Sequence, residues 1–135
     1  MKQEIIPAVM PRNIHDIASA ALSVRHAAQT VQLDLMDGNY VPVRTWPFTT
    51  HGAYDLADAQ KGDFGLPHWN EVNYELDLMV ARPEESLDDI LSLGASRIIF
   101  HFALGSNYRI GGTKNKKFVI IGEIDEGKRV SDLLQ

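Results

Sequence analysis

Residues 31–42, VQLDLMDGNYVP, contain the pattern that decides the fold: a mostly aliphatic strand that runs into a tight turn. Side chains on a strand point alternately to its two faces. One face of this strand carries Val31, Leu33 and Leu35, and the other carries Gln32, Asp34 and Met36. The aliphatic face predicts a covering layer of helices, which leaves Asp34 pointing to the interior. Asp37 and Gly38 then form a dipeptide that is typical of turns.

Strand-like and helix-like runs alternate on both sides of this stretch. The runs rich in aliphatic residues are 5–10, 30–36, 74–80 and 97–102, with a fifth at 118–121. Apolar residues at helical spacing predict a helix over 13–28, with Asn13 as its N-cap. A second helix is predicted to begin with Pro83 at its first position and to end at Gly94. The alternation predicts right-handed βαβ units and a parallel sheet.

Residues 43–73 interrupt the alternation. They contain two tryptophan-bearing pieces, TWPF and LPHWN, separated by a polar stretch. A connection of this length is uncommon in a compact domain, so we expect an irregular insertion with a functional or packing role, such as capping a barrel end. The total length of 135 residues is typical of one domain, and we expect residues 1–135 to form a single unit.

The predicted strand at 74–80 repeats the alternation seen at 31–36. Its aliphatic face carries Leu76 and Leu78, and its other face carries Glu75, Asp77 and Met79. An ionised carboxylate in a protein interior is costly unless it is paired, hydrogen-bonded or bound to metal. Asp34 and Asp77 lie near the carboxyl ends of their strands, which is the edge where (β/α) barrels carry active sites. The two residues therefore indicate a functional site at that edge.

Composition and charge exclude several classes of protein. The chain has 44% hydrophobic and 23% charged residues, as globular domains do. A net charge of -5 gives no electrostatic basis for binding nucleic acid, and the basic cluster at 114–117 predicts a solvated loop. The absence of cysteine excludes disulfides and thiolate metal sites. No apolar run has the length of a membrane span and the first residues do not resemble a signal peptide, so we expect a cytoplasmic protein.

The run VQLDLMDGNYVP resembles the signature of the ribulose-phosphate 3-epimerase family, in which a strand ending His-x-Asp-x-Met-Asp-Gly precedes an aromatic residue, Val and Pro. IIPAVM resembles the first strand of that family, and ELDLMVARPEESLDDILSLGASRIIFHF resembles its third strand, third helix and fourth strand. The resemblance covers residues 5–46 and 73–102. It implies an α/β fold, a partial TIM (β/α) barrel of the ribulose-phosphate-binding type with about five parallel strands. A complete barrel needs about 250 residues, so we expect the N-terminal part of one, from a truncated or frameshifted product.

The resemblance also implies the chemistry of the site. Members of the family hold a divalent metal with histidines and aspartates, while two aspartates transfer the proton at carbon 3 of the substrate. By this resemblance Asp34 is the catalytic acid/base. The expected metal ligands are Asp34, Asp77, Gln32 and His101, and the residues expected to line the substrate are Met36, Met79 and Ala8. Gln32 and Asp77 stand where the family has histidine, which leaves Mg, Mn, Fe and Zn as candidate metals.

The resulting hypothesis is a ribulose-phosphate 3-epimerase-like isomerase that acts on a pentulose phosphate. The isolated chain is expected to be weak or inactive, because the family's second aspartate and its phosphate-binding loops lie on later strands. The alternative is a non-catalytic sugar-phosphate-binding or assembly protein on a decayed scaffold. A related decarboxylase would need lysine where Met36 stands, which counts against it. The expected protein partner is a second copy or a missing C-terminal half, and the glycine-containing segment 105–115 is expected to be a flexible connection rather than a phosphate loop.

Overall fold

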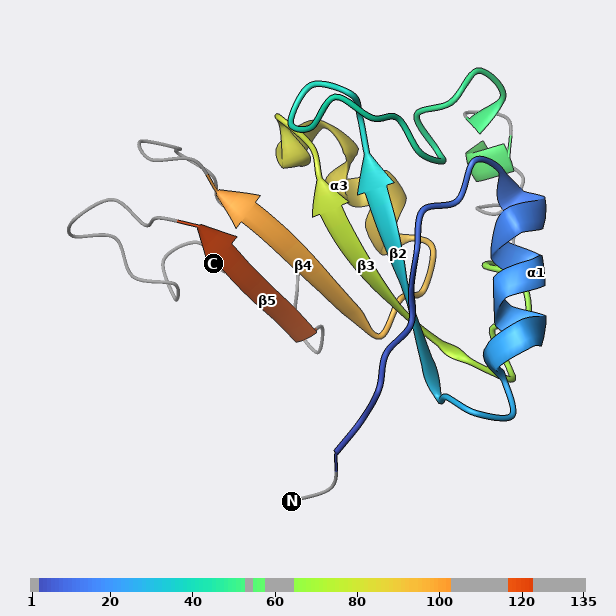
Figure 1. The fold of residues 1–135 in the computed structure, drawn as a ribbon. Coiled ribbons are helices and arrows are strands. Elements are labelled where there is room, and N and C mark those ends of the chain that lie inside the picture. Colours follow the sequence, from blue (N-terminus) through green and yellow to red (C-terminus); the bar gives the residue numbers. More distant parts are fainter. Residues whose placement is uncertain (1–2, 53–54, 58–64, 103–116, 123–135) are drawn as a thin grey trace.

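The computed structural model describes residues 3–52, 55–57, 65–102 and 117–122, and its elements alternate as an α/β fold. The elements are β1 (Ala8–Val9), α1 (Ile14–Val24), β2 (Thr30–Met36), β3 (Asn73–Met79), α3 (Pro83–Leu91), β4 (Arg97–Phe102) and β5 (Lys117–Gly122). The strands form one sheet in the order β1-β2-β3-β4-β5, and every neighbouring pair is parallel (Figure 1). The predicted parallel sheet is confirmed. The connection predicted at residues 105–115 lies outside the described residues.

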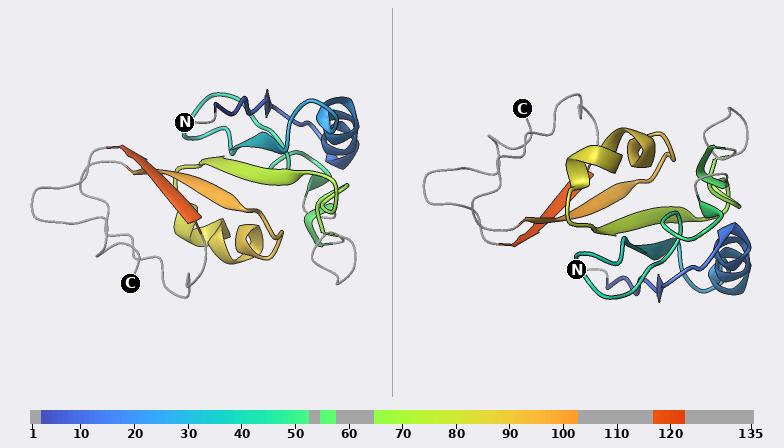
Figure 2. Two further views of the ribbon diagram at one scale, coloured as in Figure 1. Left: turned by 90° about the horizontal axis from the view of Figure 1, so that it is seen from below. Right: turned by 90° about the horizontal axis from the view of Figure 1, so that it is seen from above.

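The helices α1 and α3 cover the same side of the sheet, which is its convex side (Figure 2). Right-handed connections between strands that progress in one direction place their helices on one side, so this layering follows from the strand order. The covered face holds the core, which includes Val31, Leu33, Leu35, Leu76, Leu78 and Phe100. The opposite, concave face is left to the polar side chains of the same strands. Within the described ranges, no helix has the length and apolar character needed to cross a membrane.

Helix α1 begins as predicted and ends earlier than predicted. The Asn13 side chain accepts a hydrogen bond from the Asp16 backbone N–H at 2.9 Å, which satisfies a donor at the helix start. Ile17 and Ala21 are buried against the sheet. The helix ends at Val24 rather than at residue 28, and the chain turns there with the Ala27 and Ala28 N–H groups both donating to the Val24 carbonyl. The early end leaves only a short connection to the start of β2.

Strand β1 is much shorter than the predicted run of residues 5–10. Its ladder covers two residues, and Ile5 and Met10 beside them are 84% and 63% exposed. Pro7 accepts a bond from the Gln32 N–H through its carbonyl but has no N–H to give back, so the ladder toward β2 cannot extend through it. The aliphatic run therefore marks the place of the strand but not its length.

The connection from β2 to β3 packs back onto the sheet. Thr45 and Trp46 are buried, and so is Leu66, which belongs to the same core. The Trp46 N–H donates to the Pro11 carbonyl at 2.8 Å, which ties the connection to the end of β1. Residues 55–57 are helical, so the predicted irregular insertion is partly regular, and its last residue, Asn73, already belongs to β3.

Helix α3 starts with Pro83 at its first turn, as predicted. It ends at Leu91, three residues before the predicted end at Gly94. Gly94 has a φ of 78°, a left-handed conformation that glycine adopts without the steric cost of a side chain. Gly94 therefore turns the chain toward β4 after the helix has ended.

Candidate functional site

The concave face of the sheet carries a grid of polar side chains. Across β2 and β3, Gln32 pairs with Glu75, Asp34 with Asp77, and Met36 with Met79. At the flanks, Ala8 pairs with Gln32, and Glu75 pairs with Arg97. Asp34 and Asp77 are direct neighbours on strands about 4.8 Å apart, as the alternation of both strands predicts.

Asp34 is a partly buried carboxylate with an environment that favours its protonated form. Burial raises the pKa of Asp34 above its ordinary value, and the negative charge of Asp77 raises it further. A hydrogen bond from Gln32 Nε2 to Asp34 Oδ1, at 2.8 Å, and the nearby His101 act in the opposite direction without cancelling the rise. A carboxyl group whose pKa is moved toward neutrality is better suited to take and return protons than an ordinary aspartate.

Asp77 and His101 form a close pair on neighbouring strands. The Nε2 atom of His101 lies 2.6 Å from Oδ1 of Asp77, and each side chain is only 15% exposed. The ring of Tyr40 lies against the imidazole, with ring centroids 5.3 Å apart. His101 is thus held by a carboxylate on β3 and by an aromatic ring from the turn after β2. Sequence reasoning did not single out Tyr40, although the aromatic residue after the Asp-Gly turn was visible.

The Asp37 turn fixes Tyr40 in this place. Asp37 Oδ1 accepts the backbone N–H groups of Asn39 and Tyr40 at 2.8 and 3.0 Å, and Oδ2 accepts the N–H of Ala81 at 3.1 Å. Burial would raise the pKa of Asp37, but these N–H donors outweigh it and hold the pKa below its ordinary value. The Asp37 carboxylate therefore joins the loops after β2 and β3, in agreement with its predicted role in a turn.

Gly38 in this turn adopts a backbone conformation that would be strained for a residue with a side chain. Its φ is 83°, and a Cβ atom there would lie 2.8 Å from Cγ of Arg44. The backbones of Arg44 and Asp37 form an isolated antiparallel β-bridge. This pairing brings the chain back alongside the end of β2. Both the backbone conformation and the nearby Arg44 side chain therefore favour glycine at this position.

Thr45 fastens the carboxyl end of β2 from this returning chain. Its hydroxyl donates to the Asp34 carbonyl at 2.5 Å and accepts the Met36 N–H at 2.9 Å. The Thr45 N–H donates to the Met36 carbonyl at 2.9 Å. Thr45 is 2% exposed, so these bonds are shielded from water and set the position of the Asp34 backbone. No sequence signal pointed to this residue.

The other predicted site residues are only partly assembled. Met36 is buried and Met79 is half-buried, whereas Ala8 is exposed at the edge of the sheet. Among the described residues, no group of three or more His, Asp or Glu side chains is arranged to hold a metal ion. Asp34 bonds with Gln32, and Asp77 bonds with His101, so the expected ligands satisfy one another in pairs. Metal binding by these four residues stays a prediction.

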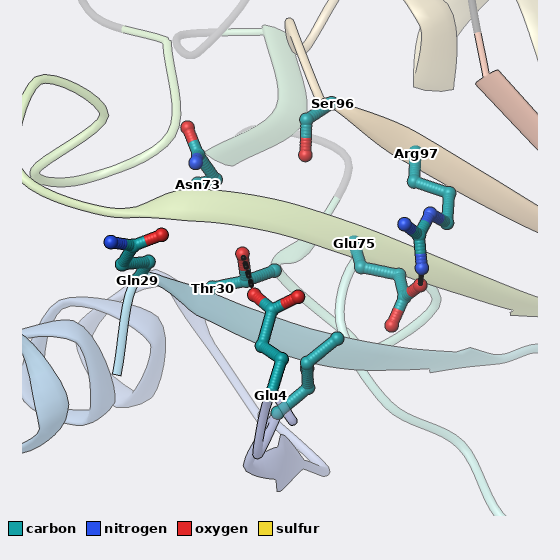
Figure 3. Close-up of a pocket in the computed structure, with 8 residues that line it drawn as sticks. Glu4, Gln29, Thr30, Asn73, Glu75, Ser96 and Arg97 are labelled. Carbon is teal, nitrogen blue, oxygen red and sulfur yellow. Dashed lines mark hydrogen bonds and ion pairs between the residues drawn. The ribbon is translucent and has the colours of Figure 1, made fainter. Parts of the chain in front are cut away.

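A polar cavity of about 320 Å³ lies at the opposite, amino end of the strands (Figure 3). Its wall includes the ion pair of Arg97 Nη1 and Glu75 Oε1, which are 2.9 Å apart. The Glu75 side chain is 5% exposed and that of Arg97 is 40% exposed. Because this ion pair joins paired positions of the neighbouring strands β3 and β4, we assign it to the packing of the sheet.

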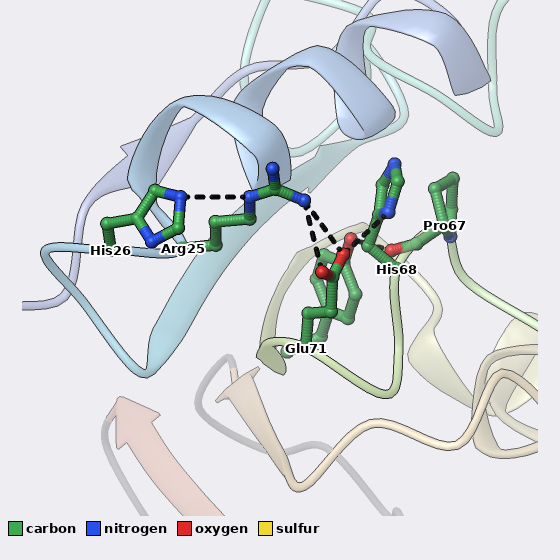
Figure 4. Close-up of polar contacts among 6 residues, drawn as sticks. Arg25, His26, Pro67, His68 and Glu71 are labelled. Carbon is green, nitrogen blue, oxygen red and sulfur yellow. Dashed lines mark hydrogen bonds and ion pairs between the residues drawn. The ribbon is translucent and has the colours of Figure 1, made fainter.

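A second polar cluster joins α1 to the segment before β3 (Figure 4). Arg25 Nη1 lies 3.0 and 3.3 Å from the two carboxylate oxygens of Glu71, and His68 Nδ1 lies 2.9 Å from Glu71 Oε2. The Tyr74 hydroxyl donates to the Pro67 carbonyl nearby. These contacts hold the amino end of β3, whereas Asp77 lies toward its carboxyl end. We therefore assign the cluster a structural role.

Comparison with known proteins agrees with part of the resemblance. The chain is 36% identical over 76 residues to a ribulose-phosphate 3-epimerase of Treponema pallidum (strain Nichols). The match covers 56% of this chain and 29% of that relative. No protein-family model matches the chain. The chain thus shares a partial, distant similarity with an epimerase and spans less than a third of its length.

Proposed function

We propose that this chain is part of an epimerase-like isomerase that transfers a proton at carbon 3 of a pentulose phosphate such as ribulose 5-phosphate. The observation that carries the proposal is Asp34, a carboxyl group with a raised pKa beside Asp77 at the carboxyl end of parallel strands. The partial similarity to a protein named ribulose-phosphate 3-epimerase supports the same reaction class.

The proposed chemistry uses the acidity of a C–H bond next to a carbonyl. A base removes the carbon 3 proton, the electron pair moves toward the carbon 2 carbonyl, and an enediolate forms. Return of a proton to the opposite face of carbon 3 gives xylulose 5-phosphate. Asp34 is suited to this exchange because its raised pKa makes it both a stronger base and a readier carrier of a proton.

We further propose that additional strands complete the site. The five strands among the described residues do not close an eight-stranded barrel, and the matched relative is more than three times longer than the matched segment. The remaining strands would come from a second copy or from further polypeptide, and would add the contacts to the substrate phosphate. Binding energy from such remote contacts helps position the reacting carbon, so the isolated chain should be a slow catalyst.

The experiment is to incubate the purified chain with each pentulose 5-phosphate epimer in D2O and to follow carbon 3 by NMR. We expect deuterium to enter at carbon 3 and epimerisation to proceed well below about 10 s⁻¹, the usual enzyme median. Asp34→Asn should slow epimerisation by about 10²- to 10⁴-fold. Asp88→Asn, the same chemical change on the exposed surface of α3, is the matched control and should leave the rate unchanged.

Absence of deuterium entry from both epimers, above the rate in buffer, would contradict the proposed function. One observation favours a second candidate, a non-catalytic sugar-phosphate-binding protein: Gln32 donates a hydrogen bond to one of the two carboxylate oxygens of Asp34, which opposes the rise in its pKa. Binding of ribulose 5-phosphate by calorimetry without deuterium entry would support that candidate.

A further inference from the structure

The polar cavity at the amino end of the strands is large enough to hold a small molecule. Its volume of about 320 Å³ is at the lower end of the range of about 300–1,000 Å³ that small-molecule sites span. Side chains at the amino ends of β2, β3 and β4 and in the segment before β1 form its wall (Figure 3). Apart from Ile6, the described residues of this wall carry polar side chains. The cavity therefore suits a polar ligand rather than an apolar one.

The Glu75 carboxylate presents an unpaired oxygen to this cavity. The side chain is 5% exposed, and its Oε1 atom lies 2.9 Å from Nη1 of Arg97. The Oε2 atom accepts no hydrogen bond from the described residues, and Figure 3 shows this second oxygen pointing away from Arg97. An ionised carboxylate has about four acceptor positions, and buried acceptors are normally satisfied. Glu75 therefore offers a buried acceptor to a ligand that donates hydrogen bonds.

The charge of the wall favours a cation at this oxygen. Glu4 belongs to the same wall, so among its described residues two carboxylates face one guanidinium, that of Arg97, and negative charge is left over. A guanidinium binds a carboxylate best through both oxygens, but Arg97 already occupies Oε1 of Glu75. The described part of the wall has no group of three or more His, Asp or Glu side chains arranged to hold a metal ion. An ammonium group is a compact cation with three donors, and it fits the one free oxygen.

The neutral groups of the wall indicate the rest of the ligand. The amides of Gln29 and Asn73 line the cavity, and neither side chain is bonded to another described residue. The Ser96 hydroxyl donates to the Tyr74 carbonyl at 3.0 Å, which leaves its oxygen as an acceptor. Amides both donate and accept, as hydroxyl groups of a ligand do. We propose that the cavity binds a small hydroxylated primary amine, with its ammonium group at Glu75 and its hydroxyl groups at the amides of Gln29 and Asn73.

The test is a titration of the purified, ¹⁵N-labelled chain with serinol, the amine analogue of glycerol, at neutral pH. Glycerol is the matched probe, because it has a hydroxyl group where serinol has its ammonium group. We expect serinol to shift the backbone amide NMR signals of Asn73, Ser96 and Arg97 saturably, whereas glycerol and potassium chloride at the same concentration should not. Glu75→Gln should weaken serinol binding by about 10- to 100-fold, since it removes a hydrogen bond between charged groups. Glu85→Gln, the same change on a side chain of α3 that is 65% exposed, is the matched control and should leave binding unchanged.

The site lies at the opposite end of the strands from Asp34, so its test does not depend on the proposed isomerase reaction. Absence of a saturable shift, equal shifts with glycerol, or shifts confined to other amides would overturn the inference. So would a Glu75→Gln variant that is folded by circular dichroism and binds serinol as the unmodified chain does.

If Glu75→Gln does not fold, Glu4→Gln decides, because Glu4 is exposed and its replacement should weaken binding by about 2- to 5-fold without unfolding the chain. Unchanged binding by that variant would overturn the inference. If serinol acts only by separating a dimer, as measured by light scattering, the ammonium group belongs to a lysine of a second copy. That result would overturn the assignment of the cavity to a small molecule.

Discussion

Replacing Thr45 with valine should loosen the end of β2 that carries Asp34. Valine has nearly the shape of threonine, so the change removes the hydroxyl without leaving a cavity. The Met36 N–H loses its partner, and the Asp34 carbonyl loses a donor, in a place that water does not reach. An unsatisfied buried group costs about 1–3 kcal/mol, so the two together should lower the free energy of unfolding by about 2–6 kcal/mol.

That loss is a large share of the roughly 5–15 kcal/mol that stabilises a typical domain. Urea unfolding followed by circular dichroism should show a lower midpoint with an unchanged slope, because the buried surface stays the same. Thr45→Ser is the matched control, since it keeps the hydroxyl and removes only a methyl group worth about 1 kcal/mol. Equal losses for serine and valine would show that packing, not the two hydrogen bonds, holds this joint, and a loss below about 0.5 kcal/mol for valine would refute the reasoning altogether.

Three further predictions concern charge and assembly. Since the pKa of Asp37 is lowered by folding, its stabilising effect should be complete above about pH 4 and disappear as the pH falls through the folded value. Asp37→Asn should therefore lower the urea midpoint at pH 7 and flatten the acid side of the stability profile, and an unchanged profile would contradict this. Arg97→Met should lower the free energy of unfolding by about 3 kcal/mol, because it leaves a buried carboxylate without its cation, and Glu75→Gln should lower it by less. Equal losses in thermal unfolding would contradict the assignment of this ion pair to the packing of the sheet. The exposed Ile5 and Met10 beside β1 favour self-association, so light scattering should detect dimers or larger species rather than a monodisperse monomer.

The strands in the middle of the sheet could be predicted closely from the sequence, whereas those governed by distant contacts could not. The run 30–36 matches β2 because alternating aliphatic residues report directly on which face is covered. The end of α1 left no such signal: residues 25–28 contain neither glycine nor proline, and the helix ends at Val24 because the chain must return to β2. Tertiary geometry overrides helix propensity at this point.

In the candidate site too, the local sequence pattern predicted some features, whereas contacts between distant residues decided others. Period-two alternation placed Asp34 and Asp77 side by side, because strand register carries each residue's face with it. It could not show that the Asp77 side chain bonds with His101, 24 residues away. Nor could it place Thr45, whose importance comes from two backbone groups on another segment.

The burial of Trp46 gives the protein an internal optical reporter. Trp46 is fully enclosed where the connection meets the end of β1, next to Thr45, whereas Trp69 is 64% exposed. Dissolved quenchers such as iodide reach an exposed indole and not an enclosed one. With Trp69 replaced by phenylalanine, the emission of the remaining indole would report on the packing of the Thr45–Trp46 segment next to the end of β2. This signal would be separate from the unfolding of the rest of the chain.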